Sequence, residues 1–266
     1  MSNIALCAIG RQENLYAREF VEHYKNLGFS KIIIMDNNYD GEEHFEDVLQ
    51  DHINQGFVII EDYRGKTKCQ MNGYTEMYKK YGNEYDWIAF LDFDEFLILP
   101  NHKSISDFLE NKSNFEVVLV NWLCMTDNNL VRYDPRPLME RFTQPMDIMK
   151  PVQYNFPDNC HIKSIVKGHL PCVRFISNPH IPTNQLKCCN ADGMMVNSSP
   201  WQQINYNNAY LKHFTTKTIE EWLTRKMKVG TPDRDPSQFL PFYKDRFFKI
   251  NKITQEKLDF IQNFRG

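Results

Sequence analysis

Four short apolar runs, separated by stretches of helical periodicity, constrain the fold of this chain more than any other feature of its sequence. The runs cover residues 4–9, 31–35, 57–60 and 88–91. Their apolar residues are continuous rather than alternating, which is typical of strands buried on both faces. After the first run, Tyr16, Phe20 and Tyr24 recur at helical spacing, and Gly28 is a suitable residue to end that helix. Strands that alternate with helices predict an α/β fold with a doubly wound, mainly parallel sheet flanked by helices.

The rest of the chain is expected to complete the same domain. Further helices are expected over residues 45–53, up to Tyr81, over 105–109 and over 254–264, and further strands over 117–122, 164–166 and 173–175. Residues 128–199 are rich in Pro, Asn, Cys and Met and predict β- and loop-rich structure packed on the first half. We therefore predict one domain over residues 1–266, with halves at 1–125 and 126–230 and a C-terminal helical extension at 231–266.

Two helix signals near the end of the chain are specific. Thr218 and Glu221 have the spacing of a capping box, and Gly230 is expected to close the helix that they begin. A Pro-containing bend is expected at residues 233–241. The last helix is amphipathic, with an inward face predicted to consist of Leu258, Ile261 and Phe264.

Bulk composition excludes several classes of protein. The net charge is −3 and the pI is about 6.2, so no electrostatic argument favours a nucleic acid partner. The N-terminus shows no leader pattern, and no window approaches the ~18 consecutive apolar residues of a membrane span, so we expect a cytoplasmic protein. The seven cysteines include no Cys-x-x-Cys pair, which predicts reduced thiols rather than disulfides or a zinc finger.

An acidic stretch follows the fourth apolar run. If the chain is still extended there, Asp92 and Asp94 lie on one face and Phe93 on the other. Adjacent carboxylates repel each other, and burying them is costly unless a cation intervenes. Hard oxygen ligands suit Mg²⁺ or Mn²⁺, with positions left for phosphate oxygens. The alternative is a solvated acidic turn with no chemistry.

Polar residues also follow the other parallel strands. The carboxyl ends of such strands meet at one edge of the sheet, where ligands bind in α/β folds. The residues that follow strands in this way are Gly10, Arg11, Asp36, Asp62, Asp92 and Asp94. Neither a Gly-x-Gly-x-x-Gly motif nor a P-loop occurs in the sequence, so a glycine cradle for phosphates is disfavoured.

Four stretches together resemble GT-A-fold glycosyltransferases of the family 2 and family 92 type. They are residues 8–14, 34–38, 92–96 and 211–221, in that order, and the resemblance extends from residue 4 to about 230. It implies inverting transfer of a sugar from a nucleotide diphosphate sugar, most often a UDP-sugar, to a hydroxyl of another glycan. Residues 1–125 would then bind the nucleotide sugar and 126–230 the acceptor. The chain departs from the family pattern at residues 125–129, where a Gly-Ser-x-Gly-type turn is usual.

The resemblance also implies roles for individual residues. Asp94, assisted by Asp92, would hold Mn²⁺ or Mg²⁺, and His213 would return to the metal or the diphosphate. The remaining donor-binding roles fall on Gly10, Arg11, Asp36, Asp62 and Lys217, with Asp92 near the ribose. His213 could equally pack near the helix start, and Lys217 could be a solvated residue.

Inversion needs a base that takes the proton of the acceptor hydroxyl. The candidates are Asp127, Glu140 and Glu95. Asp127 is placed best by its order in the chain, although an acid in an Asp-Asn-Asn loop is often only a turn residue.

Three other functions compete with glycosyl transfer. A sugar-nucleotidyltransferase would need a Gly-rich basic loop after the first strand, and residues 10–13 are a poor version of one. A two-acid glycoside hydrolase needs carboxyls about 5 Å or more apart across a sugar, so Asp92 and Asp94 are too close, and Asp94 with a distant acid is the arrangement that stays open. An inactive module could bind a nucleotide sugar without turnover. We favour a transferase acting on a surface glycan or lipid-linked saccharide, peripheral at the inner membrane face, with galactose as the donor sugar.

Overall fold

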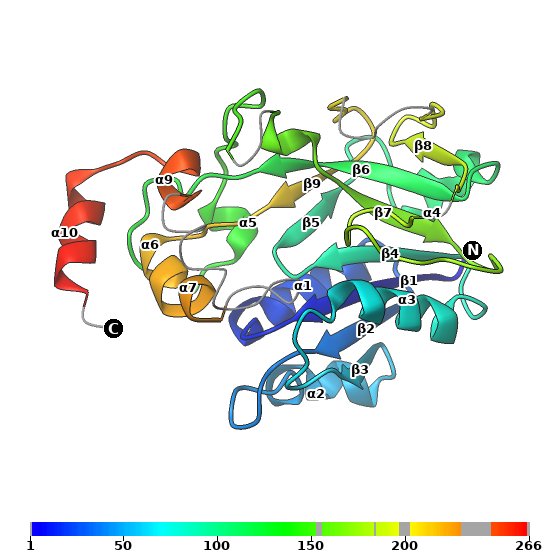
Figure 1. Cartoon of the computed structure of the whole chain (residues 1–266), viewed down its shortest axis with the longest axis horizontal. Coiled ribbons are helices and arrows are strands. Elements are labelled where there is room, and N and C mark those ends of the chain that lie inside the picture. The colour runs from blue at the N-terminus through cyan, green and yellow to red at the C-terminus, as the bar shows by residue number, and fades with distance from the viewer. Residues whose placement is uncertain (1, 153–155, 184, 197–202, 230–245, 265–266) are drawn as a thin grey trace.

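The fold is a single curled sheet with helices on both faces (Figure 1). The computed structural model describes residues 2–152, 156–183, 185–196, 203–229 and 246–264. Within these residues the strand order is β3-β2-β1-β4-β7-β6-β9-β5, and β8 pairs with β6. The strands are β1 (Ile4–Gly10), β2 (Lys31–Asp36), β3 (Val58–Asp62), β4 (Trp87–Asp92), β5 (Glu95–Ile98), β6 (Val117–Cys124), β7 (Ile162–Lys167), β8 (Cys188–Asn190) and β9 (Tyr210–His213).

The first half confirms the predicted parallel sheet. Strands β3, β2, β1 and β4 are parallel to one another. Helices α1 (Asn14–Asn26), α2 (Glu46–Asn54) and α4 (Ile105–Leu109) pack on one face, and α3 (Gln70–Tyr81) packs on the other. Gly28 follows α1 with a φ of 87°, which a residue without a Cβ adopts readily. The continuous apolar runs of β1, β2 and β4 are buried on both sides, whereas β3, at the edge of the sheet, is only partly buried.

The second half is mixed. Strand β7 is antiparallel to both β4 and β6, and β5 is antiparallel to β9. The strand predicted over residues 173–175 is wrong, because this segment joins no strand. The side chains of Val173 and Phe175 are buried against α3. The backbone N–H of Phe175 donates to the hydroxyl of Thr75 at 2.9 Å and not to a neighbouring strand.

The C-terminal part begins at the predicted capping box. Thr218 caps α6 (Ile219–Glu221), and the box is complete on both sides. The chain continues as a π-helical turn, η4 (Trp222–Lys226), and as α7 (Met227–Val229). Gly230 and the bend predicted at 233–241 lie outside the described residues. In the described part of the chain after residue 245, helices α9 (Arg246–Ile250) and α10 (Gln255–Asn263) lie at the end of the molecule farthest from the N-terminus (Figure 1).

The inward face predicted for α10 needs a correction. Leu258 is 37% exposed, whereas Lys257 is completely buried. Lys257 forms an ion pair with Asp127, and Phe260 and Ile261 pack against the small apolar cluster around Trp222. Because Lys257 must face inward to reach its partner, its neighbour Leu258 is turned toward solvent.

None of the helices that the structure describes combines the length and the hydropathy that crossing a bilayer requires.

Candidate active site

The acidic stretch turns after Asp92, so the condition under which Asp92 and Asp94 would share one face of an extended strand is not met. Strand β4 ends at Asp92, residues 93 and 94 turn, and β5 begins at Glu95. Phe93 anchors the turn, with its ring stacked on Phe45 at 5.0 Å and packed against Phe20 at 4.6 Å. The turn therefore sends the carboxylates of Asp92 and Asp94 to different sets of partners.

Gly10 gives Phe93 the space it needs. A Cβ on Gly10 would lie 2.7 Å from the Phe93 ring and 2.8 Å from the Phe45 ring. Both rings are buried and have no room to move away. The structure thus gives Gly10 a packing role at the end of β1; the nucleotide contact predicted for it stays a prediction.

Asp92 is surrounded by donors from within the chain. Its Oδ1 accepts hydrogen bonds from Gln70 Nε2 at 2.8 Å and from the Tyr74 hydroxyl at 3.2 Å. Its Oδ2 accepts from Lys163 Nζ at 2.7 Å. Lys163, on β7, is completely buried, and although burial lowers its pKa, Asp92 and Glu95 more than offset this and raise it. Lys163 is therefore a fixed cation at the tip of β4.

Asp94 meets the chain that follows β9. Pairing of β5 with β9 places Glu95 opposite His213, and the carbonyl of Asp94 accepts from the Phe214 N–H at 2.8 Å. This register brings Asp94 Oδ1 to 3.5 Å from His213 Nε2. The other oxygen, Oδ2, lies 3.7 Å from Lys226 Nζ at the end of the π-helical turn.

The two groups are in the protonation states that a metal ligand needs. Burial would raise the pKa of Asp94, but Lys226 and His213 hold it well below its usual value, so the carboxylate is ionised. Burial lowers the pKa of His213 despite the opposing effect of Asp94, so the imidazole is neutral near pH 7. His213 Nδ1 is buried and has no hydrogen-bond partner among the described residues.

A divalent cation fits between Asp94 and His213. Neighbouring ligands of a six-coordinate ion with bonds of about 2.1 Å stand about 3 Å apart, close to the 3.5 Å between Oδ1 and Nε2. The nitrogen donor favours Mn²⁺ over Mg²⁺. Asp92 fits less directly, because both of its oxygens already accept from side chains. Its predicted role at the metal stays a prediction.

Glu95 is the most buried acid of the stretch. Its side chain has no exposed surface, its Oε2 accepts from the Asp92 N–H at 2.9 Å, and its Oε1 has no partner among the residues described. Burial raises its pKa well above the usual value, with Lys163 opposing and Asp92 adding to the rise.

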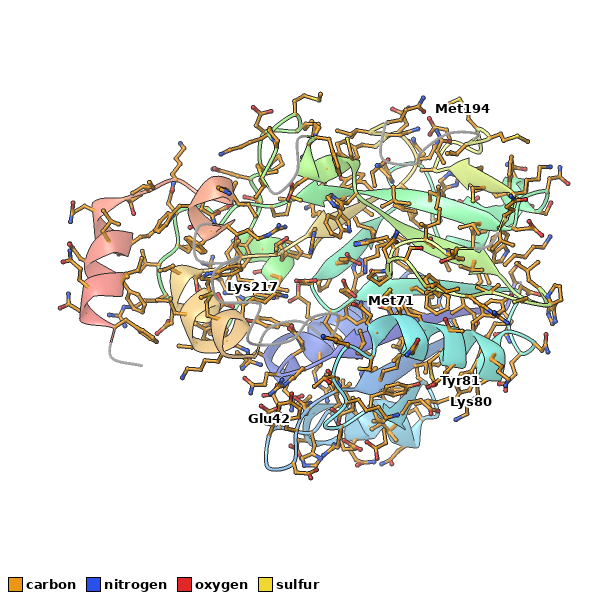
Figure 2. All side chains as sticks on the ribbon, viewed as in Figure 1. Glu42, Met71, Lys80, Tyr81, Met194 and Lys217 are labelled. Atoms are coloured by element: carbon orange, nitrogen blue, oxygen red, sulfur yellow. The ribbon has the colours of Figure 1, made fainter. Side chains whose placement is uncertain are left out.

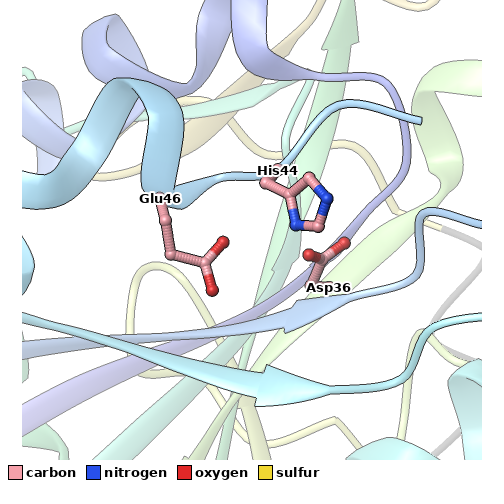
Figure 3. A group of neighbouring side chains, drawn as sticks. All are labelled: Asp36, His44 and Glu46. Atoms are coloured by element: carbon pink, nitrogen blue, oxygen red, sulfur yellow. The ribbon is translucent and has the colours of Figure 1, made fainter. Parts of the chain in front are cut away.

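Asp36 belongs to a different cluster, at the end of β2 (Figure 3). Asp36, His44 and Glu46 each offer an atom that could bind a metal ion, and these three atoms lie within 4.8 Å of one another. The guanidinium of Arg64 lies among these side chains. It forms an ion pair with Asp36 and lies 3.0 Å from His44 Nε2. The cluster is thus built around a guanidinium group. Asp62 is exposed at the end of β3, where it accepts from the Arg64 N–H at 3.0 Å.

Arg11 is also held by the chain. Its guanidinium makes two hydrogen bonds to Glu42, at 3.0 and 2.9 Å, and lies 3.6 Å above the ring of Tyr39. It nevertheless lines a small cavity of about 30 Å³ between the loop after β1 and the chain after β9. The cavity is lined by Arg11, Gln12, Glu13, Tyr16, Thr215, Thr216, Lys217, Glu221, Arg225 and Lys226.

Lys217, which is labelled in Figure 2, lines this cavity. Its backbone has a φ of 53°, a left-handed conformation that is costly for a residue with a Cβ. Its Nζ lies 4.4 Å from the centre of the Tyr16 ring and 4.0 Å from Glu13 Oε2. The site thus has cations from two elements, Lys217 before α6 and Arg225 with Lys226 on the π-helical turn. Arg225 and Lys226 were not predicted; their place one turn after the capping box was the only signal.

The three predicted bases fall in three different places. Asp127 is buried, its Oδ1 accepts from the Asn129 N–H at 2.9 Å, and its other oxygen pairs with Lys257. These are the contacts of a structural ion pair and do not support a role as base. Glu140 is exposed on the short helix α5 (Leu138–Arg141). Glu95 alone lies in the acidic turn.

Comparison with known proteins identifies the family. The model of glycosyltransferase family 92 matches residues 3–238. The chain belongs to this family. A family 92 protein of Ricinus communis is 26% identical over 111 residues, which are 42% of this chain and 20% of that protein; one of Oryza sativa subsp. japonica is 25% identical over 111 residues, 42% and 19%. The matched stretch is therefore about a fifth of the length of these relatives.

Solved structures of lower similarity were also found. S. aureus TarS 1-349 is 10% identical, with a TM-score of 0.45 over 99% of this chain and 75% of that one. Its complex with UDP gives a TM-score of 0.44 at the same identity and coverage.

Proposed function

We propose that this chain is a metal-dependent, inverting glycosyltransferase that uses a UDP-sugar as donor. The acceptor would be a hydroxyl of a surface glycan or lipid-linked saccharide, and the protein would work at the inner face of a membrane without crossing it. The observation that carries the proposal is the pairing of Asp94 with His213 beside a cavity lined by cations, in a chain of glycosyltransferase family 92.

Each group has a task in this reaction. Asp94 and His213 would hold Mn²⁺ or Mg²⁺, and with that ion bound the site supplies a Lewis acid for the charge that develops on the departing diphosphate. Lys217 would bind a phosphate oxygen as a point charge. Asp92, which accepts a hydrogen bond from Lys163, would contact the ribose. The Lys217 side chain is largely buried, so its charge interaction with a phosphate would be stronger than in water.

The acceptor hydroxyl must lose a proton as it attacks from the side opposite the diphosphate. Of the predicted bases, Glu95 is nearest to the acidic turn, and its Oε1 accepts no hydrogen bond from the described residues. Burial raises the pKa of Glu95, which makes its carboxylate a stronger base than an exposed one. We therefore retain Glu95 as the first candidate for mutation.

The protein's own lysines support a second hypothesis, in which the reaction needs no metal. Lys163 and Lys226 already place ammonium groups 2.7 Å from Asp92 and 3.7 Å from Asp94. Cations supplied by the protein could neutralise the diphosphate without a metal, or the pocket could bind a nucleotide sugar and not turn it over.

A hydrolysis screen separates these possibilities. UDP-, GDP- and dTDP-sugars, UDP-galactose first, are incubated with the protein and Mn²⁺, and nucleotide release is measured for the wild type and for Asp94→Ala. We expect slow cleavage of one UDP-sugar, loss of cleavage with a chelator, and loss of cleavage in Asp94→Ala. A matched control is Asp107→Ala, an exposed acid on α4.

Equal rates in wild type and Asp94→Ala would remove the metal role of Asp94. Cleavage that survives chelation would favour the protein's own lysines, and UDP binding without cleavage of any donor would favour a binding module.

A further inference from the structure

One acid in the cavity is left unexplained by the reaction described above. Glu13 lies in the loop between β1 and α1, where its backbone carbonyl accepts from the Tyr16 and Ala17 N–H groups at 2.9 and 3.0 Å. These bonds fix its backbone at the start of α1. Its side chain lines the cavity, and its Oε2 is buried without a hydrogen-bond partner among the described residues. A buried carboxylate oxygen without a donor is costly, so a missing donor is expected.

Thr215 shows the same feature from the opposite wall. It lies two residues after His213, is 7% exposed, and its hydroxyl oxygen is also buried without a partner in the part of the chain that is described. The two unsatisfied oxygens therefore line one cavity and come from segments about 200 positions apart in the chain. A carboxylate accepts only, whereas a hydroxyl donates and accepts. A group with hydroxyls of its own would satisfy both.

The cavity has the size of such a group. Its volume of about 30 Å³ compares with the ~10–15 Å³ that one ordered water needs. It holds one or two hydroxyl-sized groups but not a whole nucleotide sugar. A diphosphate inside the cavity itself would put a second anion beside Glu13 in a buried place, so the group that enters the cavity is expected to be neutral.

The charges around Glu13 fit a neutral ligand group as well. Burial raises the pKa of Glu13 and Asp94 adds to the rise, while Lys217, Lys226 and Arg225 lower it. Lys217 Nζ is 4.0 Å away from Oε2, too far for a hydrogen bond. The cations balance the charge of Glu13 but leave its oxygen free to accept from a hydroxyl.

We propose that Glu13, with Thr215, accepts a hydroxyl of the donor nucleotide sugar and so determines which donor the enzyme uses. The inference rests on the function proposed above and deepens it. In the proposed reaction the charged part of the donor faces three cations, which are Lys217, Arg225 and Lys226. Glu13 recognises one hydroxyl of the same donor. Sites built to bind a substrate hydroxyl discriminate strongly against the analogue that lacks it, because the protein group is then left unpaired.

The test is a cycle that combines protein variants with donor analogues. The donor is the UDP-sugar that the wild type cleaves best, with UDP-galactose tried first, and the analogues lack single hydroxyls of the sugar or the 2′-hydroxyl of the ribose. The kcat/KM for nucleotide release and the Kd from calorimetry are measured for wild type, Glu13→Ala, Glu13→Gln and the control Glu84→Ala. Glu84 is an exposed acid in the turn after α3.

We expect the wild type to prefer the parent donor over one deoxy analogue by about 10- to 100-fold, the range of a hydrogen bond to a charged group. Glu13→Ala should no longer discriminate between the parent donor and that one analogue. With every other analogue, the ratio of its kcat/KM to that of the parent donor should be the same as in the wild type. Glu13→Gln, which keeps an accepting oxygen, should retain part of the preference. Glu84→Ala should match the wild type. Thermal unfolding and circular dichroism confirm that each variant is folded.

Two results would overturn the inference. If Glu13→Ala weakens all donors equally, Glu13 only positions the cations. If it abolishes kcat with every donor while the Kd values stay unchanged, Glu13 acts in the chemical step. A wild type that neither binds nor cleaves any UDP-sugar would instead refute the proposed function.

Discussion

The buried ion pair between Arg141 and Glu221 allows the most direct test of how this site is held. Arg141 donates to the two carboxylate oxygens at 3.0 and 3.1 Å, and the Tyr16 hydroxyl donates at 2.6 Å. Thr218 adds the capping-box bonds, from its N–H at 3.1 Å and its hydroxyl at 2.7 Å. The pair thereby ties the segment that carries Lys217 to α5 and α1.

Glu221→Gln would leave the Arg141 charge buried without compensation. The side chains of Arg141 and Glu221 are only 1% and 3% exposed. Breaking one partner of such a pair costs about 3–5 kcal/mol of the free energy of unfolding. For a domain of this size 1 kcal/mol lowers the melting temperature by about 2–4 °C, so a fall of about 6–20 °C is expected. Thermal and urea unfolding followed by circular dichroism at pH 7 measure it.

The pH dependence of this loss has a defined sign. Burial raises the pKa of Glu221, but hydrogen bonding and the charge of Arg141 more than offset this and lower it. A lowered pKa stabilises the fold above the unfolded value of about 4.3, and this contribution is lost as the pH falls through the lower folded value. The difference between wild type and Glu221→Gln should therefore be full at pH 6–7 and shrink below about pH 4.

Controls make the result specific. Arg136→Ala breaks an exposed pair with Asp134 and should not change the melting temperature measurably. The double variant Arg141→Met with Glu221→Leu removes both charges and should recover much of the stability. A loss below about 1 kcal/mol in Glu221→Gln, which is the range of a surface pair, would refute the reasoning.

Two further predictions follow from packing and charge. Gly10→Ala should lower the free energy of unfolding by about 1–3 kcal/mol, because its Cβ would meet the Phe93 and Phe45 rings. The control Gly41→Ala meets no atom within 4 Å but has a φ of 83°, so it shows the effect of backbone strain without crowding. Urea unfolding measures both losses, and equal losses would contradict the crowding argument. Lys257→Met should lower the free energy of unfolding by about 3–5 kcal/mol at pH 7, because Asp127 would be left buried and unpaired. Burial raises the pKa of Asp127, so Asp127 becomes neutral and the loss of stability should shrink as the pH falls. A loss that calorimetry finds independent of pH between 4 and 7 would contradict this prediction.

Much of the first half could be predicted from sequence because its signals are local. An apolar run reports burial on both faces, so β1, β2, β3 and β4 were located within a few residues. The capping box at Thr218 was identified from residues three positions apart. The failures have local causes too. Val173 and Phe175 are apolar and buried against α3 without forming a strand, and the chain turns at Phe93 instead of staying extended.

The partners of the site residues could not be predicted in the same way. Lys163 lies 71 positions from Asp92, and Tyr16 lies 205 positions from Glu221. Asp127, predicted as a base from its order in the chain, is engaged by Lys257 on the last helix. Periodicity reports which side of an element is buried but not which distant side chain meets it there.

The sequence by itself determined the sheet of the first half, the acidic stretch at the end of β4 and the family of the chain. Only the tertiary structure decided that Asp94 faces His213 and Lys226 while Asp92 faces Lys163. The reason is physical: secondary structure follows from the preferences of neighbouring residues, whereas the charge environment of a buried carboxylate depends on which strands pair. The register that sets Glu95 opposite His213 fixes that environment, and it forms only when β5 and β9 meet.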